Sequence, residues 1–266
     1  MKEELICAGE AVRVLKRDFR KYSKIVTSLY LGAFVDFEIS RLSRCAYFFF
    51  KYLDDIADGD FPLNNPLSYL EKVKNQIEIR DFDNSEMGFL ARDIINRLES
   101  GNGRENNPRE KILASLDSII FDYKRSIERK TLSYSELMEY YRLSFFSVID
   151  LCLMGIKSDI SAEDISGFCY SQGRVYSVRD LEEDWKKGII NIPAEDLELA
   201  GIDSKFSVDF LMKNPMIKRW AAKELVQSKI LLEDIRSRYE TFDRRTRLVL
   251  KGLNEGMLKY IKTQGF

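Results

Sequence analysis

With 266 residues, of which 45% are hydrophobic, the chain is long enough to bury a substantial core. Its 42 basic and 43 acidic residues give a net charge of −1, so nothing in the charge balance points to nucleic acid as a partner. Histidine is absent and the four cysteines are scattered, which excludes histidine-based triads and the usual zinc sites. Any metal must therefore be held by oxygen ligands, which favours a hard cation such as Mg²⁺.

Helical periodicity dominates the chain from its first residues onward. Apolar side chains from Ala11 to Ile25 recur at helical spacing and predict a first helix over 9–25. Further helices are predicted over 38–58, 66–80, 86–100, 108–130, 134–155, 161–187, 207–213, 216–240 and 242–263. Ser133 and Glu136 fit a capping box. Strand-like alternation is nearly missing and no low-complexity linker divides the chain, so we predict one all-α domain over residues 1–266.

The sequence shows neither the pattern of a membrane-spanning segment nor that of a secretory signal peptide. No apolar run reaches the length of about 18 residues that a membrane span needs. The N-terminal segment lacks the pattern of a signal peptide, and the cysteines do not form a disulfide framework. We therefore expect a cytoplasmic protein.

Two segments gather carboxylates on predicted helices. Asp54 and Asp58 are four residues apart, as are Asp180 and Asp184, so each pair shares one helix face. Like charges at this spacing destabilise a helix unless a cation or a solvated surface compensates them. A solvated helix face is the simpler interpretation, but the apolar segment that leads into Asp54 favours a site. Two such carboxylate pairs facing across a helical bundle could hold Mg²⁺ bound to a diphosphate.

The residues around both pairs resemble the squalene/phytoene synthases. The segment AYFFFKYLDDIAD at 46–58 resembles the helix that ends in the family's first aspartate motif. The segment RDLEED at 179–184 resembles the family's Arg-Asp-x-x-x-Asp motif, and Gly188, Pro193 and Glu-Asp-Leu follow it as in the family. Weaker matches are Ser28-Leu29-Tyr30-Leu31, Arg41, and the Tyr-rich helix that begins at Tyr140-Tyr141, where Ser144 and Ser147 replace glycines.

The resemblance implies a fold and a set of residue roles. The fold would be the isoprenoid synthase (class I terpenoid) fold, an all-α bundle with a central cavity. Metal ligands would be Asp54, Asp58, Asp180 and Asp184, holding two or three Mg²⁺ ions. Tyr30, Tyr140 and Arg179 would take part in catalysis, the tyrosines because an aromatic face stabilises a cation. Substrate contacts would come from Ser28, Arg41, Lys51, Tyr141, Gln172 and Tyr176.

The implied reaction joins two allylic isoprenyl diphosphates, farnesyl or geranylgeranyl, head to head. It passes through a cyclopropyl diphosphate and gives a squalene- or phytoene-type product, with NADPH needed only for squalene. Since the substrates carry long hydrophobic chains and the products are hydrophobic, we expect loose peripheral contact with a membrane surface.

Three departures from the family pattern leave other activities open. Gly173 and Tyr176 replace a glutamine and a metal-binding asparagine, Lys51 replaces an arginine, and Ser144 and Ser147 replace glycines. Two alternatives therefore remain: a terpene cyclase that acts on a single prenyl diphosphate, or a catalytically inactive family member that serves as a binding or assembly protein.

Overall fold

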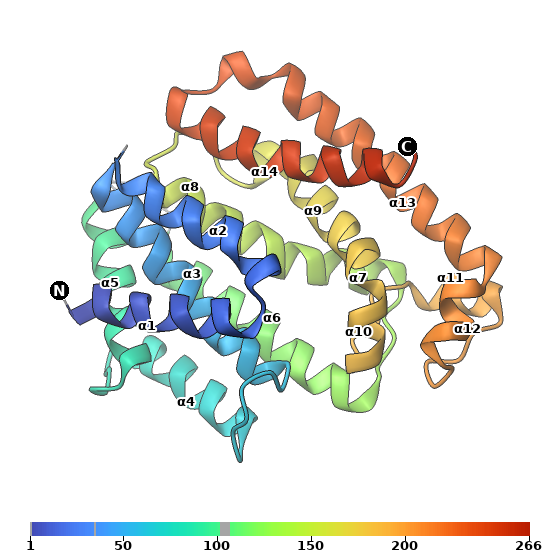
Figure 1. Cartoon of the computed structure of the whole chain (residues 1–266), viewed down its shortest axis with the longest axis horizontal. Helices are drawn as coiled ribbons and strands as arrows, with labels where there is room; N and C mark the ends of the chain where they lie inside the picture. Colours follow the sequence, from blue (N-terminus) through green and yellow to red (C-terminus); the bar gives the residue numbers. More distant parts are fainter. Residues whose placement is uncertain (1, 35, 102–106) are drawn as a thin grey trace. The chain divides into compact units, whose positions relative to one another are not determined.

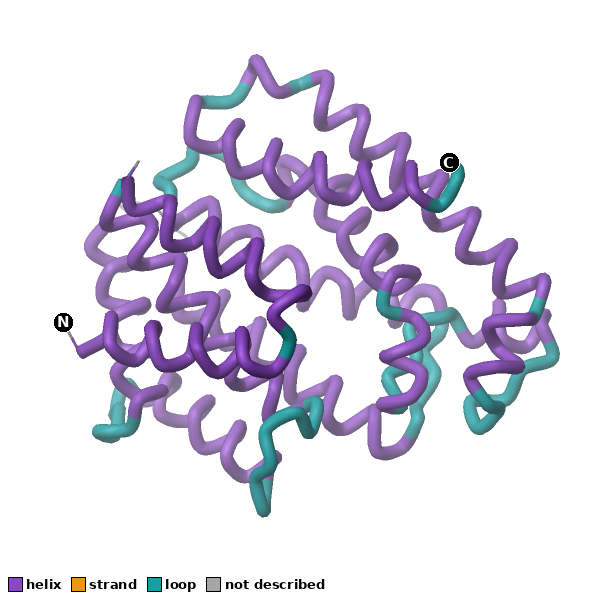
Figure 2. The backbone as a smooth tube through the Cα atoms, in the orientation of Figure 1, coloured by secondary structure: helices purple, strands orange, loops and turns teal. Residues whose placement is uncertain are grey.

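The computed structural model describes residues 2–34, 36–101 and 107–266. These residues are mainly helical and contain no β-strand, which confirms the predicted all-α class (Figure 2). One isolated backbone bridge joins Leu132 and Pro193. Contacts divide the chain into two compact units, which we describe separately: unit 1 is Met1–Ile120 with Met154–Lys157, and unit 2 is Phe121–Leu153 with Ser158–Phe266. The single-domain organisation stays a prediction.

Unit 1 is built around one long helix (Figure 1). Its helices are α1 (Lys2–Arg17), α2 (Phe19–Leu31), α3 (Phe37–Ala57), α4 (Pro66–Ile79), α5 (Glu86–Gly101) and the first part of α6 (Pro108–Glu128). Helices α1 and α5 pack against α3, whose Phe48, Phe49 and Leu53 are fully buried between its neighbours. Burial of such side chains stabilises the fold by about 2 kcal/mol each. The C-terminal end of α3 therefore has a fixed position, and Asp54 lies there.

Unit 2 contains the remaining helices. They are the rest of α6, then α7 (Tyr134–Tyr141), α8 (Ser147–Gly155, whose last two residues belong to unit 1), α9 (Ser166–Arg179), α10 (Leu181–Lys187), α11 (Ala194–Ala200), α12 (Val208–Lys213), α13 (Pro215–Ser237) and α14 (Arg244–Thr263). Helix α9 packs along α13. A second apolar cluster gathers around Trp185 and Trp220, and it fixes the segment that follows α9.

Helix ends differ from the sequence prediction at two aspartates across which the apolar periodicity continues. The helix predicted over 9–25 is wrong, because Asp18 adopts an extended backbone and its side chain accepts a hydrogen bond from the Lys21 amide at 2.9 Å. The helix predicted over 161–187 breaks at Asp180, which separates α9 from α10. Helix α11 was not predicted at all.

The helix predicted over 134–155 is also not uniform. It starts with the predicted capping box, in which Ser133 and Glu136 exchange hydrogen bonds. A π-helical turn over Arg142–Phe146 then separates α7 from α8. Such turns are rare and often lie at functional sites, and this one follows directly after Tyr140 and Tyr141.

Candidate functional site

The first acidic motif lies at the C-terminal end of α3 in unit 1. The Asp54 side chain is 46% exposed and accepts a hydrogen bond from the Lys51 ammonium at 2.6 Å. Asp58 ends the helix, and its amide donates to the Asp54 carbonyl at 2.8 Å. The two predicted metal ligands of this unit thus lie one turn apart, with a predicted phosphate-binding cation beside the first.

Asp55, between them, has a different environment. Its carboxylate is fully buried and forms ion pairs with Arg13 at 2.7 Å, Arg17 at 2.8 Å and Lys51 at 2.7 Å. Burial opposes its charge, but Lys51 and the two arginines outweigh burial and lower the pKa of Asp55. This aspartate therefore ties α1 to α3. Sequence reasoning missed the role of Arg13 and Arg17, although their four-residue spacing places both on one face of α1.

The second acidic motif lies at the junction of α9 and α10 in unit 2. The Arg179 guanidinium binds both carboxylate oxygens of Asp180, at 2.8 and 2.6 Å, and lies over the Tyr176 ring at 4.2 Å. One turn further along, the Asp184 carboxylate accepts a hydrogen bond from the Asn191 amide at 3.0 Å. A partly exposed aspartate beside a basic side chain thus occurs in both units.

The other predicted residues of unit 2 lie mainly inside it. The Tyr140 hydroxyl donates to Asp122 at 2.6 Å, and burial together with that carboxylate raises the pKa of Tyr140 well above its usual value. Tyr141 is buried and its hydroxyl hydrogen-bonds the Ser177 hydroxyl at 2.6 Å. Gln172 is also buried. Direct substrate contact by Tyr141 or Gln172 stays a prediction.

The remaining predicted residues of unit 1 are engaged elsewhere. The Ser28 hydroxyl donates to the Lys24 carbonyl, one turn back in α2, at 2.9 Å. The Tyr30 hydroxyl is buried without a hydrogen-bond partner, and the Arg44 guanidinium lies over its ring at 4.9 Å. Roles for Ser28 and Tyr30 in substrate binding or catalysis stay predictions.

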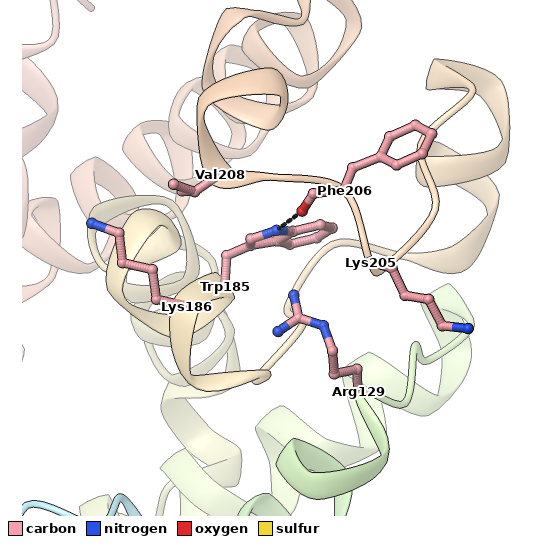
Figure 3. Close-up of a pocket in the computed structure, with 6 residues that line it drawn as sticks. All are labelled: Arg129, Trp185, Lys186, Lys205, Phe206 and Val208. Atoms are coloured by element: carbon pink, nitrogen blue, oxygen red, sulfur yellow. Dashed lines mark hydrogen bonds between the residues drawn. The ribbon is translucent and has the colours of Figure 1, made fainter.

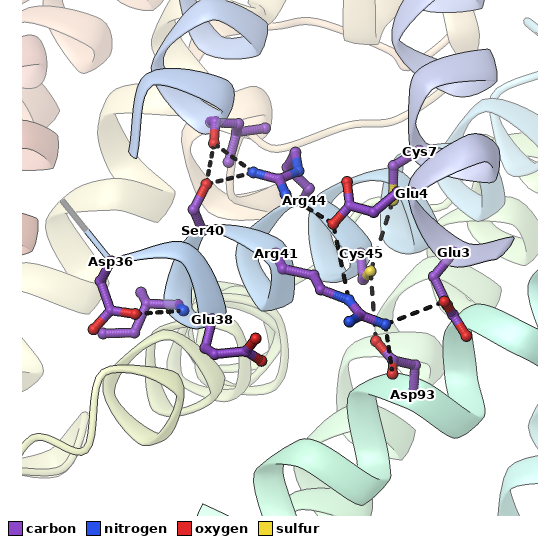
Figure 4. A network of polar contacts seen from close by, with 12 residues as sticks. Glu3, Glu4, Cys7, Asp36, Glu38, Ser40, Arg41, Arg44, Cys45 and Asp93 are labelled. Atoms are coloured by element: carbon purple, nitrogen blue, oxygen red, sulfur yellow. Dashed lines mark hydrogen bonds and ion pairs between the residues drawn. The ribbon is translucent and has the colours of Figure 1, made fainter. Parts of the chain in front are cut away.

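Arg41 belongs to an ion-pair network between α1, α3 and α5 (Figure 4). Its guanidinium lies 3.1 Å from Glu3, 3.5 Å from Asp93 and 3.8 Å from Glu4. Contact with a substrate phosphate would require Arg41 to leave three carboxylates.

The donor chemistry of both motifs fits Mg²⁺ shared with a diphosphate. Among residues 2–34, 36–101 and 107–266, no three Asp, Glu, Cys or His side chains converge closely enough to hold a metal ion by themselves. Mg²⁺ typically takes one or two carboxylates and completes its shell with waters and substrate phosphates. A pair of aspartates one turn apart, partly open to solvent, matches that requirement in each unit.

A separate shallow pocket of ≈ 320 Å³ lies in unit 2 (Figure 3). Its lining residues are Arg129, Trp185, Lys186, Lys205, Phe206 and Val208. The Trp185 indole donates to the Phe206 carbonyl at 2.9 Å, and the Arg129 guanidinium lies over the indole at 5.4 Å. Trp185 is therefore a packing residue, and none of the predicted site residues lines this pocket.

No helix in the part of the chain that the structure describes combines the length and apolar character that a membrane span needs. Cytoplasmic location and peripheral membrane contact stay predictions.

Comparison with known proteins identifies the family. The chain matches a family model described as squalene/phytoene synthase over residues 40–261. No curated protein sequence matches it. Its fold is similar to a crystal structure of squalene synthase HpnC from Alicyclobacillus acidocaldarius, with a TM-score of 0.68 and 20% identity over 97% of this chain and 95% of that one. The family match covers both acidic motifs, and the chain belongs to the squalene/phytoene synthase family.

Proposed function

We propose that the protein condenses two allylic isoprenyl diphosphates, farnesyl or geranylgeranyl, head to head in a Mg²⁺-dependent reaction. The observation that carries this proposal is the repeated arrangement of an aspartate pair beside a cation: Asp54 and Asp58 with Lys51, and Asp180 and Asp184 with Arg179. Family membership and the all-α fold support it.

The cations beside the aspartates have a defined task in this proposal. In the free protein Lys51 and Arg179 neutralise Asp54 and Asp180. Mg²⁺ supplies charge neutralisation on the leaving diphosphate. When the carboxylates bind the metal, Lys51 and Arg179 can bind phosphate oxygens instead. Arg179 would make a bidentate contact, and Lys51 would act as a point charge.

The chemistry that follows needs few protein groups. Departure of diphosphate takes the electron pair of the C–O bond and leaves an allylic cation, which the double bond of the second substrate captures. Loss of a proton closes the ring of the cyclopropyl diphosphate. A second ionisation and rearrangement give a cation that either loses a proton, yielding a phytoene-type product, or accepts hydride from NADPH, yielding squalene.

The test measures diphosphate release and organic products. The purified protein is incubated with Mg²⁺ and farnesyl or geranylgeranyl diphosphate, with and without NADPH, and extracts are analysed by mass spectrometry. We expect a hydrocarbon that contains both substrate chains, and we expect Asp54→Ala and Asp180→Ala to abolish it.

Asp117→Ala provides the matched control, because Asp117 is 42% exposed and pairs with Lys74 at 2.7 Å, much as Asp54 pairs with Lys51. This variant should retain activity. A product made from one substrate chain would instead identify a cyclase. Folded protein that releases no diphosphate would identify an inactive family member.

A further inference from the structure

A continuous hydrogen-bonded chain of side chains runs through unit 2 from Asp184 to Tyr140, and its central members, Asn191 and Arg125, are buried. Asn191 donates to Asp184 at 3.0 Å and accepts from the Arg125 guanidinium at 2.6 Å. Arg125 also donates to Asp122 at 2.7 Å, and the other oxygen of Asp122 accepts from the Tyr140 hydroxyl at 2.6 Å. Four hydrogen bonds thus connect the last aspartate of the second acidic motif to a predicted catalytic tyrosine.

The donor and acceptor roles in this network are fixed by its chemistry. Arginine has only donors, so the oxygen of the Asn191 amide must face Arg125. The amide nitrogen must then face Asp184, whose carboxylate accepts. Arg125 is only 1% exposed, and its third contact is to the Ile190 carbonyl at 3.0 Å. Turning the Asn191 amide over would set its nitrogen against the Arg125 donors and its oxygen against the Asp184 carboxylate, so the network favours one orientation of this amide.

The backbone is shaped to bring Asn191 against α6. Helix α10 ends at Gly188, whose φ of 84° is left-handed, and a Cβ atom there would lie 2.3 Å from the Ser126 carbonyl oxygen. The chain therefore passes α6 at a distance that only glycine permits. The Ala194 amide then donates to the Leu132 carbonyl at 2.8 Å, which secures the far end of the segment.

Two members of the network contact Tyr140 at the other end. Its hydroxyl proton is directed to Asp122, and the Arg125 guanidinium lies 4.4 Å from its ring centroid. Burial opposes the charge of Arg125, but Asp122 outweighs burial and raises the pKa of Arg125. The guanidinium thus remains a permanent cation between Asp184 and Tyr140.

We infer that Arg125 and Asn191 are positioning residues that hold Asp184 in the orientation needed to bind Mg²⁺ and diphosphate. This inference rests on the proposed function, because it takes Asp184 as a metal ligand. Partners that orient a ligating carboxylate typically contribute a factor of about 10–100 in metal affinity. Neither Arg125 nor Asn191 belongs to the acidic motifs, so their role follows from the network alone.

The probe is inorganic diphosphate, titrated calorimetrically into the full-length protein at several Mg²⁺ concentrations. Asn191→Ala removes the donor to Asp184, and Arg125→Lys keeps the charge but cannot reach Asn191, Ile190 and Asp122 together. We expect both variants to weaken Mg²⁺-dependent diphosphate binding by about 10–100-fold. Arg125→Lys serves as the informative variant if Asn191→Ala fails to fold.

The matched control is Asn254→Ala, which removes another buried amide of unit 2, one that donates to Leu232 and Tyr239. It should lower stability without changing diphosphate affinity, which separates positioning from general loss of packing. Wild-type affinity in folded Asn191→Ala and Arg125→Lys would overturn the inference and leave the proposed function standing. Absence of Mg²⁺-dependent binding in the wild type would overturn both.

Discussion

The ring of Tyr141 packs directly against the backbone of Gly173. A Cβ atom at position 173 would lie 2.5 to 2.7 Å from three ring atoms of Tyr141. Gly173 is one of the positions at which the sequence departs from the squalene/phytoene synthase pattern. The departure has a local reason: any side chain on α9 at this position would displace Tyr141 and break its hydrogen bond to Ser177.

Gly173→Ala should therefore destabilise the protein although it replaces glycine inside a helix. Added methyl groups in a packed interior cost about 1–3 kcal/mol. This cost exceeds the gain of about 0.5–1 kcal/mol that alanine normally gives over glycine in a helix. We expect a lower urea midpoint with an unchanged slope of the unfolding transition.

Gly252→Ala is the control for this experiment. Gly252 lies on the exposed face of α14, and a Cβ atom there would meet no other atom within 4 Å. Its replacement should raise stability by about 0.5–1 kcal/mol. Stabilisation by both substitutions would show that Tyr141 does not constrain position 173.

The sequence predicted the helical class and the one-turn spacing within each aspartate pair, because both depend on local spacing. It failed at Asp18 and Asp180, where the apolar periodicity continues across a helix break. Whether an aspartate stays in a helix or caps the next one depends on competition between its side chain and the helical backbone for the same amides. Periodicity does not report that competition.

Within the candidate site, the sequence alone did not show that Asp54 is exposed whereas Asp55 is buried in ion pairs. Both carboxylates belong to the same motif, but the two arginines that bury Asp55 come from α1, which lies about forty positions earlier in the chain. The role of Asn191 was likewise missed, because its contact to Arg125 joins residues 66 positions apart. Long-range ion pairs and hydrogen bonds of this kind leave no periodic signal.

Asp55→Asn should destabilise the protein strongly. The substitution leaves Arg13, Arg17 and Lys51 close together without their shared anion. Removing one partner of a buried ion pair costs about 3–5 kcal/mol. Asp54→Asn should cost less than about 1 kcal/mol, since its ion pair is exposed, while it abolishes turnover. The free energy of unfolding of both variants is measured by urea unfolding. An equal loss of stability in the two would contradict the assignment of Asp55 as the structural aspartate and Asp54 as the exposed one.

The ion pairs of Asp55 should also make the stability of the protein depend on pH. Because the pKa of Asp55 is lowered in the folded state, its contribution is fully present above the unfolded pKa of about 3.9. It is lost as the pH falls below that value through the folded pKa, where the carboxylate becomes protonated. We therefore expect the difference in unfolding free energy between wild type and Asp55→Asn to shrink below about pH 4. A difference that stays constant into that range would contradict the assignment.

Replacing a glycine at a helix end can destabilise the protein through backbone strain or through a steric clash of the added Cβ, and comparison of Gly188 with Gly201 distinguishes the two effects. Both have left-handed backbones, with φ of 84° and 64°, but an added Cβ would meet the Ser126 carbonyl only at position 188, whereas it meets nothing within 4 Å at position 201. Gly201→Ala should thus cost only the conformational penalty of about 1–2 kcal/mol. Gly188→Ala should add an overpacking penalty of about 1–3 kcal/mol, and it should weaken Mg²⁺-dependent diphosphate binding because the segment that carries Asn191 must move away from α6. Urea unfolding and calorimetric titration of both variants test this. If Gly188→Ala loses stability but binds diphosphate as tightly as Gly201→Ala does, the close passage of the chain along α6 serves packing alone and does not position Asp184.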